Sequence, residues 1–135
     1  MKKKILVVIA DYYKNISLNL MNSAINEIKK IYSFKIITVP GVFEIPITIS
    51  KNIKRYDGFI ALGCVIKGQT PHFDFISKAT TDAIMKLSIQ SQKPIGNGII
   101  TCLNKKQALD RSKTKGQEAA KAVLSVLKSF DNPPE

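Results

Sequence analysis

Apolar residues along this chain fall into two alternating patterns. Short apolar runs have the length and composition of strands, and the first of them is rich in β-branched residues, which is typical of a strand buried on both faces of a sheet. They span 4–10, 34–39, 59–65 and 95–102. Between and after these runs, apolar residues recur every three or four positions, as on the core-facing side of a helix. This spacing predicts helices at 17–32, 43–53, 72–91 and 115–129, with a separate helical turn at 107–111.

Three of the predicted helices carry a clear apolar row that we expect to face the core. In the first helix the row is Leu20, Met21, Ala24, Ile25, Ile28 and Ile31. In the third helix it is Phe73, Ile76, Ala79, Ala83, Ile84 and Leu87, and in the last it is Ala119, Ala122, Val123, Val126 and Leu127. Asn15 and Ser17 are alternative caps for the start of the first helix.

The alternation of strands and helices, joined by short connections, predicts a parallel sheet with right-handed crossovers. We therefore expect an α/β protein with three layers (α/β/α) around a four-stranded parallel sheet. The chain shows no internal repeat or linker, so we expect a single domain over 1–135. Ligands of such sheets bind outside the carboxyl ends of the strands. These ends are followed here by polar segments at 11–13, 40–44, 66–72 and from 101 onward.

The formal net charge is +11, with 21 basic and 10 acidic residues in 135. Such an excess can mark a nucleic-acid or membrane partner. However, the lysines are spread along the chain, and Arg55 and Arg111 are its two arginines. Few aromatic residues interleave with the basic ones, as stacking on single strands would require. This distribution favours a general role of the lysines in solvation. Attraction of anionic metabolites is the next interpretation, and nucleic-acid binding is the least favoured. We also expect no membrane partner.

The beginning of the chain superficially resembles a secretion signal, because lysines at 2–4 precede an apolar run at 5–10. The run is short, ends at Asp11 and lacks a small-residue cleavage site, so a buried first strand is the better interpretation. No apolar run approaches the ~18 residues that a membrane span needs. Cys64 and Cys102 lie in or beside apolar runs and are expected to be buried free thiols. We therefore expect a cytoplasmic protein. We expect no zinc site, because one histidine and two distant cysteines do not have the spacing of zinc ligands.

The candidate chemistry lies in the segments that follow the predicted strands. His72 is the single histidine, and an imidazole exchanges protons near neutral pH because its unperturbed pKa is roughly 6.5. A surface or helix-capping histidine is the alternative interpretation. The backbone of Gly68, Gln69 and Thr70 precedes a helix and offers an anion site, or only an ordinary helix start. Arg111 could grip a phosphate or pair with a neighbouring acid.

Two further residues have both a structural and a functional interpretation. Glu44 follows Pro-Gly in an apolar setting, where its carboxylate could accept hydrogen bonds from a polyol. It could equally be an acid favoured at a helix start. Tyr12 could stack on a flat ring or simply cover the edge of the core.

Three segments resemble the lumazine synthase family, whose members make 6,7-dimethyl-8-ribityllumazine. They are 39–46 (VPGVFEIP), 63–74 (GCVIKGQTPHFD) and 107–120 with its QALDR and KGQEAA sequences. The resemblance is collinear over nearly the whole chain. It implies a flavodoxin-like fold and the condensation of 5-amino-6-(D-ribitylamino)uracil with 3,4-dihydroxy-2-butanone 4-phosphate. The products are the lumazine, phosphate and water, and the family uses no metal or organic cofactor.

The resemblance also implies a role for each matching position. His72 would transfer protons, and Tyr12 would stack on the pyrimidine. Val42, Phe43 and Glu44 match the stretch that holds the ribityl chain and ring, and Val65 and Ile66 match backbone contacts to the pyrimidine. The phosphate site would comprise Gln69, Thr70 and Arg111, with Lys115 near the substrate. The sequence departs from the family at Asn97, where an aromatic residue is common, at Tyr13 and Lys67, and in a shortened segment between Arg111 and Lys115.

The family assembles as pentamers, some of which pack into larger shells, and its sites lie between subunits. The resemblance therefore implies that Tyr12, Glu44 and His72 face Asn97, Arg111 and Lys115 of a neighbouring chain. Because this chain starts directly at its first strand, we expect a pentamer rather than a shell. Two alternatives stay open: a riboflavin synthase of the lumazine-synthase-like type, and a non-catalytic protein that binds a flavin or RNA.

Overall fold

A computed structural model describes residues 3–68 and 72–134 of the chain. Four strands and their helices alternate along it, as the sequence pattern predicts. The strands are β1 (Lys4–Ala10), β2 (Ser33–Val39), β3 (Gly58–Ile66) and β4 (Ile95–Cys102). The helices are α1 (Lys14–Ile28), the 3-10 turn η1 (Val42–Glu44), α2 (Ile45–Lys51), α3 (Phe73–Ser91) and α4 (Lys105–Asp131).

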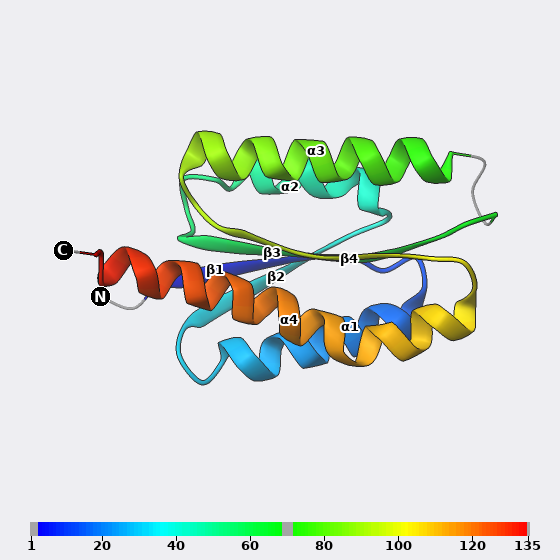
Figure 1. Cartoon of the computed structure of the whole chain (residues 1–135), viewed down its shortest axis with the longest axis horizontal. Helices are drawn as coiled ribbons and strands as arrows, with labels where there is room; N and C mark the ends of the chain where they lie inside the picture. The colour runs from blue at the N-terminus through cyan, green and yellow to red at the C-terminus, as the bar shows by residue number, and fades with distance from the viewer. Residues whose placement is uncertain (1–2, 69–71, 135) are drawn as a thin grey trace.

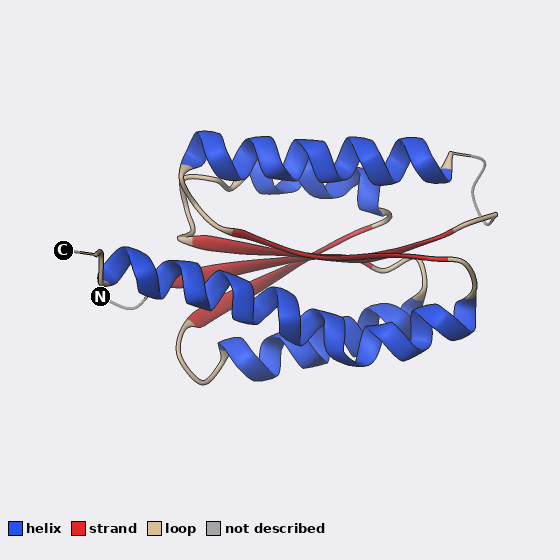
Figure 2. Cartoon of the chain, in the orientation of Figure 1, coloured by secondary structure: helices blue, strands red, loops and turns tan. Residues whose placement is uncertain are grey.

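The strands form one parallel sheet in the order β2-β1-β3-β4, and helices cover both of its faces. α1 and α4 lie on one face, and α2 and α3 lie on the other (Figures 1 and 2). The predicted three-layer α/β/α fold is therefore confirmed. The order matches the flavodoxin-like arrangement, in which the strand order reverses direction between β1 and β3.

The sheet separates two apolar cores, because successive side chains of a strand point to opposite faces. Ile5, Val7 and Ile9 of β1 pack under α1 and α4, whereas Leu6 and Val8 pack under α2 and α3. All nine residues of β3 are buried, so this central strand is covered on both faces. The sheet is thus a rigid base from which the loops at its carboxyl edge project.

The first helix differs from its predicted bounds and capping. It begins at Lys14 with Tyr13 as the capping residue, and no side chain caps it. Ser17 is buried, and its hydroxyl donates to the carbonyl oxygen of Ala10 at 2.7 Å instead of capping. The helix ends at Ile28, and Ile31 is exposed beyond it. The predicted start at 17 and the predicted end at 32 are both wrong, and the helix ends early because the chain turns through 29–32 to enter β2.

The predicted break between two C-terminal helices is also absent, because α4 is continuous through 112–114. Ser112 is fully buried there and donates to the Leu109 carbonyl, while the Asn19 amide of α1 donates to its hydroxyl at 3.1 Å. Ala122 and Val126, expected in the core, instead lie on the exposed side of the helix. Ala79 of α3 is likewise exposed, because Thr80 and Ile84 take the buried positions.

Glycine lets α4 approach its neighbours closely. A Cβ atom on Gly116 would lie 2.0 Å from the Leu20 carbonyl oxygen of α1, and one on Gly96 would lie 2.3 Å from the Ala119 carbonyl oxygen. Both contacts involve backbone atoms, which cannot move aside as a flexible side chain can. The helix is therefore fixed against α1 and against β4 by positions without side chains.

Candidate active site at the carboxyl edge of the sheet

A cleft of about 190 Å³ opens at the carboxyl ends of β1 and β3. This is the point where the strand order reverses, and α/β sheets bind their ligands there. Segments from 10–13, 41–43 and 64–65, together with one residue of α3, form the cleft. Its lining residues are Ala10, Tyr12, Tyr13, Gly41, Val42, Phe43, Cys64, Val65 and Ile76.

The 41–44 segment is held against the sheet by a glycine in β3. A Cβ on Gly63 would lie 2.6 Å from a methyl carbon of Val42 and 3.2 Å from the Ala10 Cβ, so glycine makes room for Val42. Val42 is consequently buried, while Phe43 is 65% exposed at the cleft. The Glu44 carboxylate curls back, because its Oε1 would lie 3.3 Å from a Cβ on Gly41. No hydrogen bond engages this carboxylate within the described part of the chain.

Two tyrosines follow β1 and form one wall of the cleft. Their rings meet edge to face, with centroids 4.9 Å apart and planes at 84°. Tyr12 is 69% exposed and offers a free ring face, whereas the Tyr13 hydroxyl is buried and has no partner in the described residues. Burial, followed by the nearby Cys64 and Tyr12, raises the pKa of Tyr13. Tyr13 is therefore a neutral support that orients the exposed ring of Tyr12.

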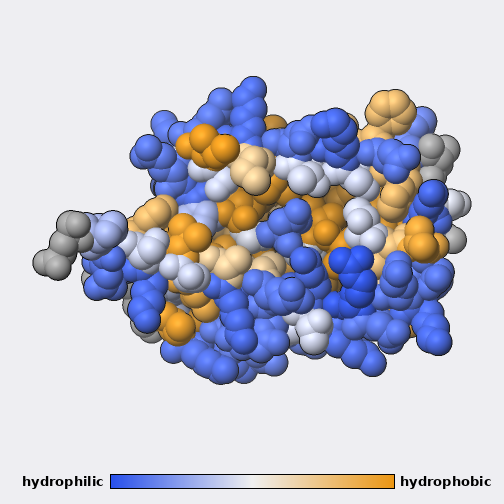
Figure 3. Space-filling model, viewed as in Figure 1, coloured by the Kyte–Doolittle hydropathy of each residue, from blue (hydrophilic) through white to orange (hydrophobic). Residues whose placement is uncertain are grey.

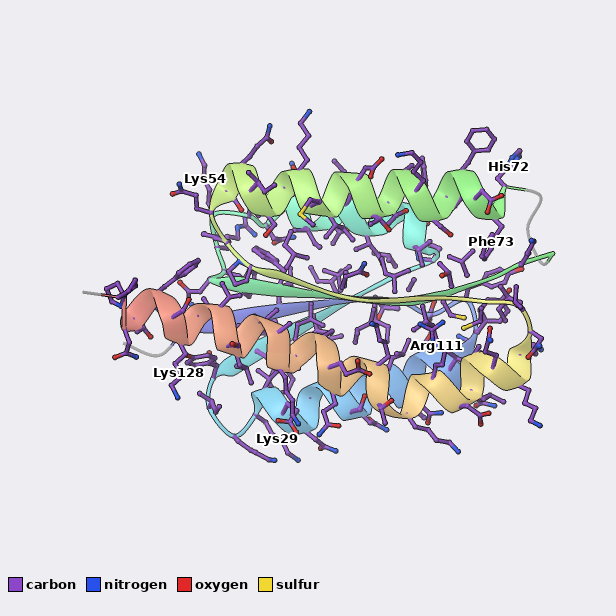
Figure 4. The ribbon with its side chains drawn as sticks, in the orientation of Figure 1. Lys29, Lys54, His72, Phe73, Arg111 and Lys128 are labelled. Atoms are coloured by element: carbon purple, nitrogen blue, oxygen red, sulfur yellow. The ribbon has the colours of Figure 1, made fainter. Side chains whose placement is uncertain are left out.

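His72 is the residue before the first turn of α3, and Figure 4 shows its side chain at the start of that helix, pointing away from the sheet. The imidazole is exposed and lies 6.3 Å, centroid to centroid, from the ring of Phe75. Gly68 precedes it with φ +83, a left-handed conformation that favours glycine and turns the chain away from β3. Gln69 and Thr70, predicted for the anion site, lie outside the described residues.

Arg111 is anchored at the end of β4, on the opposite side of the sheet from His72 (Figure 4). Its Nη1 donates to the Thr101 carbonyl oxygen at 3.0 Å and to the Cys102 sulfur at 3.6 Å. Lys67 is tied to the same strand end, since its backbone N–H donates to the Cys102 carbonyl at 2.8 Å. The exposed guanidinium keeps its other donors, and it carries no ion pair with Asp110 or any other described acid.

The two cysteines are buried, free and adjacent at the floor of this edge. Cys64 is 7% exposed and lines the cleft, and Cys102 lies between it and Arg111. Burial, with the adjacent Cys102, raises the pKa of the Cys64 thiol to about 12, although Arg111 opposes the shift. Cys64 is therefore a neutral thiol rather than a nucleophile at physiological pH.

The structure brings together only part of the predicted residue set in one chain. Val65 lines the cleft, whereas the side chain of Ile66 points into the core beneath α1 and α4. Lys115 follows Arg111 by one helical turn and is half-buried without a described hydrogen bond. Asn97 lies away from the cleft, in a groove along the free edge of β4.

That groove has a volume of about 660 Å³ and is the larger of the two hollows. It runs between α3 and α4, where Figure 3 shows apolar surface at the centre of the molecule. Apolar residues dominate its lining, among them Ile84, Met85, Ile89, Ile95, Val123, Val126 and Phe130. An apolar surface of this kind, exposed beside an unpaired strand, is typical of a protein–protein contact.

Several lining residues were not predicted as site residues. Ala10 and Gly41 contribute by backbone position and small size, which no polar pattern signals. Cys64 and Ile76 were assigned to the core from their apolar surroundings, although both border the cleft. The position of Cys64 near the end of the predicted strand, beside Val65, could have indicated it, because ligands of α/β sheets bind at the carboxyl ends of the strands.

No group of three or more His, Cys, Asp or Glu side chains in 3–68 and 72–134 is placed to hold a metal ion. No helix in that part of the chain is both long and apolar enough to cross a membrane.

The parallel three-layer fold, with its cleft at the reversal of strand order, defines an α/β protein of the class that keeps its ligand site at the carboxyl edge of the sheet. Residues 2–131 match the family described as 6,7-dimethyl-8-ribityllumazine synthase. The chain belongs to this enzyme family.

Named relatives support the same assignment over nearly full length. A 6,7-dimethyl-8-ribityllumazine synthase of Bartonella tribocorum is 41% identical over 94% of this chain and 91% of its own length. The Nitrobacter hamburgensis enzyme of that name is 38% identical over 91% of this chain and 83% of its own length. The one from Cutibacterium acnes is 35% identical over 92% and 80%. Neither a riboflavin synthase nor a non-catalytic binding protein is favoured by these matches.

Proposed function

We propose that this protein condenses 5-amino-6-(D-ribitylamino)uracil with 3,4-dihydroxy-2-butanone 4-phosphate to give 6,7-dimethyl-8-ribityllumazine, phosphate and water. The observation that carries the proposal is a cleft with an exposed aromatic ring, together with an anchored, unpaired guanidinium that a neighbouring subunit would bring to this cleft from the end of its own β4. The family membership supplies the reaction.

The pyrimidine stacks on Tyr12, and its ring and ribityl chain lie along 42–44. The free carboxylate of Glu44 suits the ribityl hydroxyls, because an ionised carboxylate accepts hydrogen bonds from several donors. Backbone groups at Val65 and Ile66 contact the pyrimidine edge. The buried apolar floor at Val42 and Val65 favours a flat ring over water.

The butanone phosphate binds with its phosphate at Arg111, together with Gln69 and Thr70. A guanidinium already held by the Thr101 carbonyl keeps other N–H donors for phosphate oxygens, and little side-chain entropy is lost on binding. Lys67 and Lys115 add positive charge around the same end of the sheet. The ketone is thereby presented to the amino group of the pyrimidine, and this positioning lowers the entropic part of the barrier.

His72 moves protons during the reaction. The amine attacks the ketone, water leaves, phosphate is eliminated and the ribitylamino nitrogen closes the ring. Each step needs a proton to be taken up or released near neutral pH, which suits an exposed imidazole one helical turn before Ile76, a residue that lines the cleft.

The protein further acts as a pentamer whose sites lie between subunits. Asn97 lies in the apolar groove rather than in the cleft, so it would reach substrate only from a neighbouring chain. A second copy covering the groove would bury Met85, Ile89 and Phe130, which are exposed in one chain. We also propose a cytoplasmic location, since both cysteines are free, and small-molecule substrates without a nucleic-acid partner.

The reaction is tested by mixing the purified protein with both substrates and following the fluorescence of the lumazine. Product formation that depends on both substrates is expected. Absence of product would favour a binding protein, and conversion of added lumazine into riboflavin would favour the riboflavin synthase.

The shared site is tested by mixing subunits of two impaired variants. A pentamer has five times the 15.0 kDa mass of one chain, which sedimentation measures directly. When His72→Ala and Arg111→Ala subunits are unfolded, mixed and refolded together, intact sites form where one chain gives His72 and its neighbour gives Arg111. Random mixing should restore about a quarter of the wild-type activity. No gain over the separate variants, or a shell-sized particle, would contradict the proposal.

A further inference from the structure

A second cleft lies at the opposite, amino end of the sheet, away from the proposed active site. It has a volume of about 430 Å³ and is formed by the starts of β1 and β2 and by the turn that leads into β3. Its lining combines three cations with two aromatic rings. The lining residues are Lys4, Ser33, Phe34, Lys35, Arg55 and Tyr56.

The cations of this cleft converge by strand register. Leu6 pairs with Lys35, and Lys4 lies two residues before Leu6 on the same strand, so both lysines are on the sheet face covered by α2. Arg55 reaches the same place from the turn after α2. Three positive groups thus share one hollow, and their mutual repulsion is unfavourable for the folded chain.

No ion pair within 3–68 and 72–134 joins these three cations to an acidic side chain. The ion pairs of the described residues join Lys3 to Asp131, Lys14 to Asp11 and Lys78 to Asp82. The nearest acid by contact is Asp57, whose Oδ2 accepts the backbone N–H of Lys4 at 2.8 Å. Its single negative charge leaves the group of three cations with a net positive charge.

Other lysines at this end of the molecule have a simpler explanation. Lys29, Lys54 and Lys128 lie toward the same end in Figure 4, at or just beyond the carboxyl ends of α1, α2 and α4. The negative end of a helix dipole favours cations there. Lys4 and Lys35 are strand residues without such a partner, so their gathering calls for a different account.

Tyr56 gives the cleft a flat apolar wall on the face that carries the two lysines. It is half-buried, and its ring is fixed edge-on against Phe59 at a centroid distance of 6.1 Å. Phe34 is half-buried, and its ring packs on the opposite face of the sheet, beneath α1 and α4. Rings beside cations suit an anion that carries a flat ring, because bases stack on aromatic side chains while phosphates bind the cations.

We propose that this cleft binds a nucleoside phosphate, with the phosphate between Lys4, Lys35 and Arg55 and the base against Tyr56. The volume falls in the range of small-molecule sites and matches one nucleotide better than a strand of nucleic acid, which needs a row of stacking positions. This site is separate from the condensation reaction and does not depend on it.

The test uses adenosine 5′-diphosphate as the probe and calorimetry as the readout. Lys35→Gln combined with Arg55→Gln should weaken binding by at least about tenfold, because two charge-assisted contacts are lost. The matched control combines Lys86→Gln with Lys121→Gln, two exposed lysines on α3 and α4 that lower the net charge equally. An equal loss in both double variants would show general charge attraction and overturn the proposal.

Backbone NMR of the unmodified protein locates the site independently of any variant. Shifts at Ser33 and Tyr56 on addition of the diphosphate are expected, and shifts confined to Thr101 and Arg111 would overturn the proposal. Adenosine or inorganic phosphate should each bind at least about tenfold more weakly than the diphosphate, since each supplies half of the contacts. Equal binding by either one, or binding of a hexanucleotide without the diphosphate, would also contradict a nucleoside phosphate site.

Discussion

The guanidinium of Arg111 donates to the Thr101 carbonyl oxygen at 3.0 Å, which ties α4 to the end of β4 across a ten-residue separation. Thr101 is an exposed residue of the edge strand, and the same guanidinium nitrogen also reaches the Cys102 sulfur. The arginine is therefore oriented before any ligand arrives. Such pre-orientation reduces the entropy lost when an anion binds.

Replacing Arg111 by alanine should weaken the butanone phosphate far more than the pyrimidine. Loss of charge-assisted bonds to phosphate, at about 1.5–3 kcal/mol each, corresponds to a rise in KM of roughly 10- to 100-fold. Steady-state kinetics with each substrate varied in turn measures both values. Lys113→Ala, an exposed change on the same helix, serves as the control and should leave both values unaltered. An unchanged KM for the phosphate in Arg111→Ala would refute the phosphate assignment.

Replacing His72 by alanine should lower turnover without abolishing it. Positioned acid–base catalysis contributes about 10²–10⁴-fold, and we expect kcat to fall by about 10²-fold because substrate orientation is retained. Single-turnover fluorescence measures the chemical step. Phe75→Ala serves as the control, because it removes the ring beside the imidazole and leaves His72 in place. The Phe75 side chain is 76% exposed, so this variant separates loss of packing from loss of the proton carrier. A rate equal to that of the wild type in His72→Ala would exclude His72 from proton transfer.

Replacing Gly116 by alanine should destabilise the protein, although alanine favours a helix by about 1 kcal/mol over glycine. The new Cβ would lie 2.0 Å from the Leu20 carbonyl oxygen, so α1 and α4 must separate. We expect a net loss of about 1–3 kcal/mol in the free energy of unfolding, typical of overpacking. Urea unfolding measures it, with Thr114→Ala on the exposed side of α4 as the control. A gain in stability would mean that the helices are not in this close contact.

Stability should fall in alkaline solution through the Cys64 thiol. Its pKa rises to about 12 in the folded protein, so the unfolded chain loses this proton first as pH rises above about 9. Between about pH 9 and pH 12, this one thiol lowers the free energy of unfolding by up to about 1.4 kcal/mol for each pH unit. Comparing the slopes of unfolding free energy against pH for wild type and Cys64→Ala isolates this thiol from the tyrosines and lysines. Parallel slopes would show that Cys64 titrates normally.

The sequence pattern predicts the sheet better than the helices, because each strand is a short apolar run that turn residues follow or precede. The strand at 95–102 is found at those residues. In contrast, α4 was divided at 112–114 because a hydrophobic pattern does not register Ser112 and Gly116 as buried positions. Their burial depends on the backbone and Asn19 of α1, which are distant in sequence.

The candidate site could be predicted as an edge of the sheet but not as a set of contacts. The carboxyl ends of β1 and β3 bring Tyr12, Phe43 and Val65 to one cleft, as the rule for α/β sheets requires. The position of Asn97 was not predictable from strand order, because it depends on the face and edge of β4 on which the side chain lies. The anchoring of Arg111 by a backbone carbonyl likewise has no signature in residue type.

The glycine contact between α4 and α1 also fixes how many residues can separate Gly116 from Arg111. Each residue added to a helix rotates everything beyond it by about 100°. One inserted residue would turn a larger side chain toward the Leu20 carbonyl or carry the guanidinium away from Thr101. In this chain, therefore, a residue inserted between Arg111 and Gly116 would have to be balanced by a bulge in the helix. With the short spacing from Arg111 to Lys115, α4 is continuous, Gly116 contacts α1, and Arg111 reaches the Thr101 carbonyl at the same time.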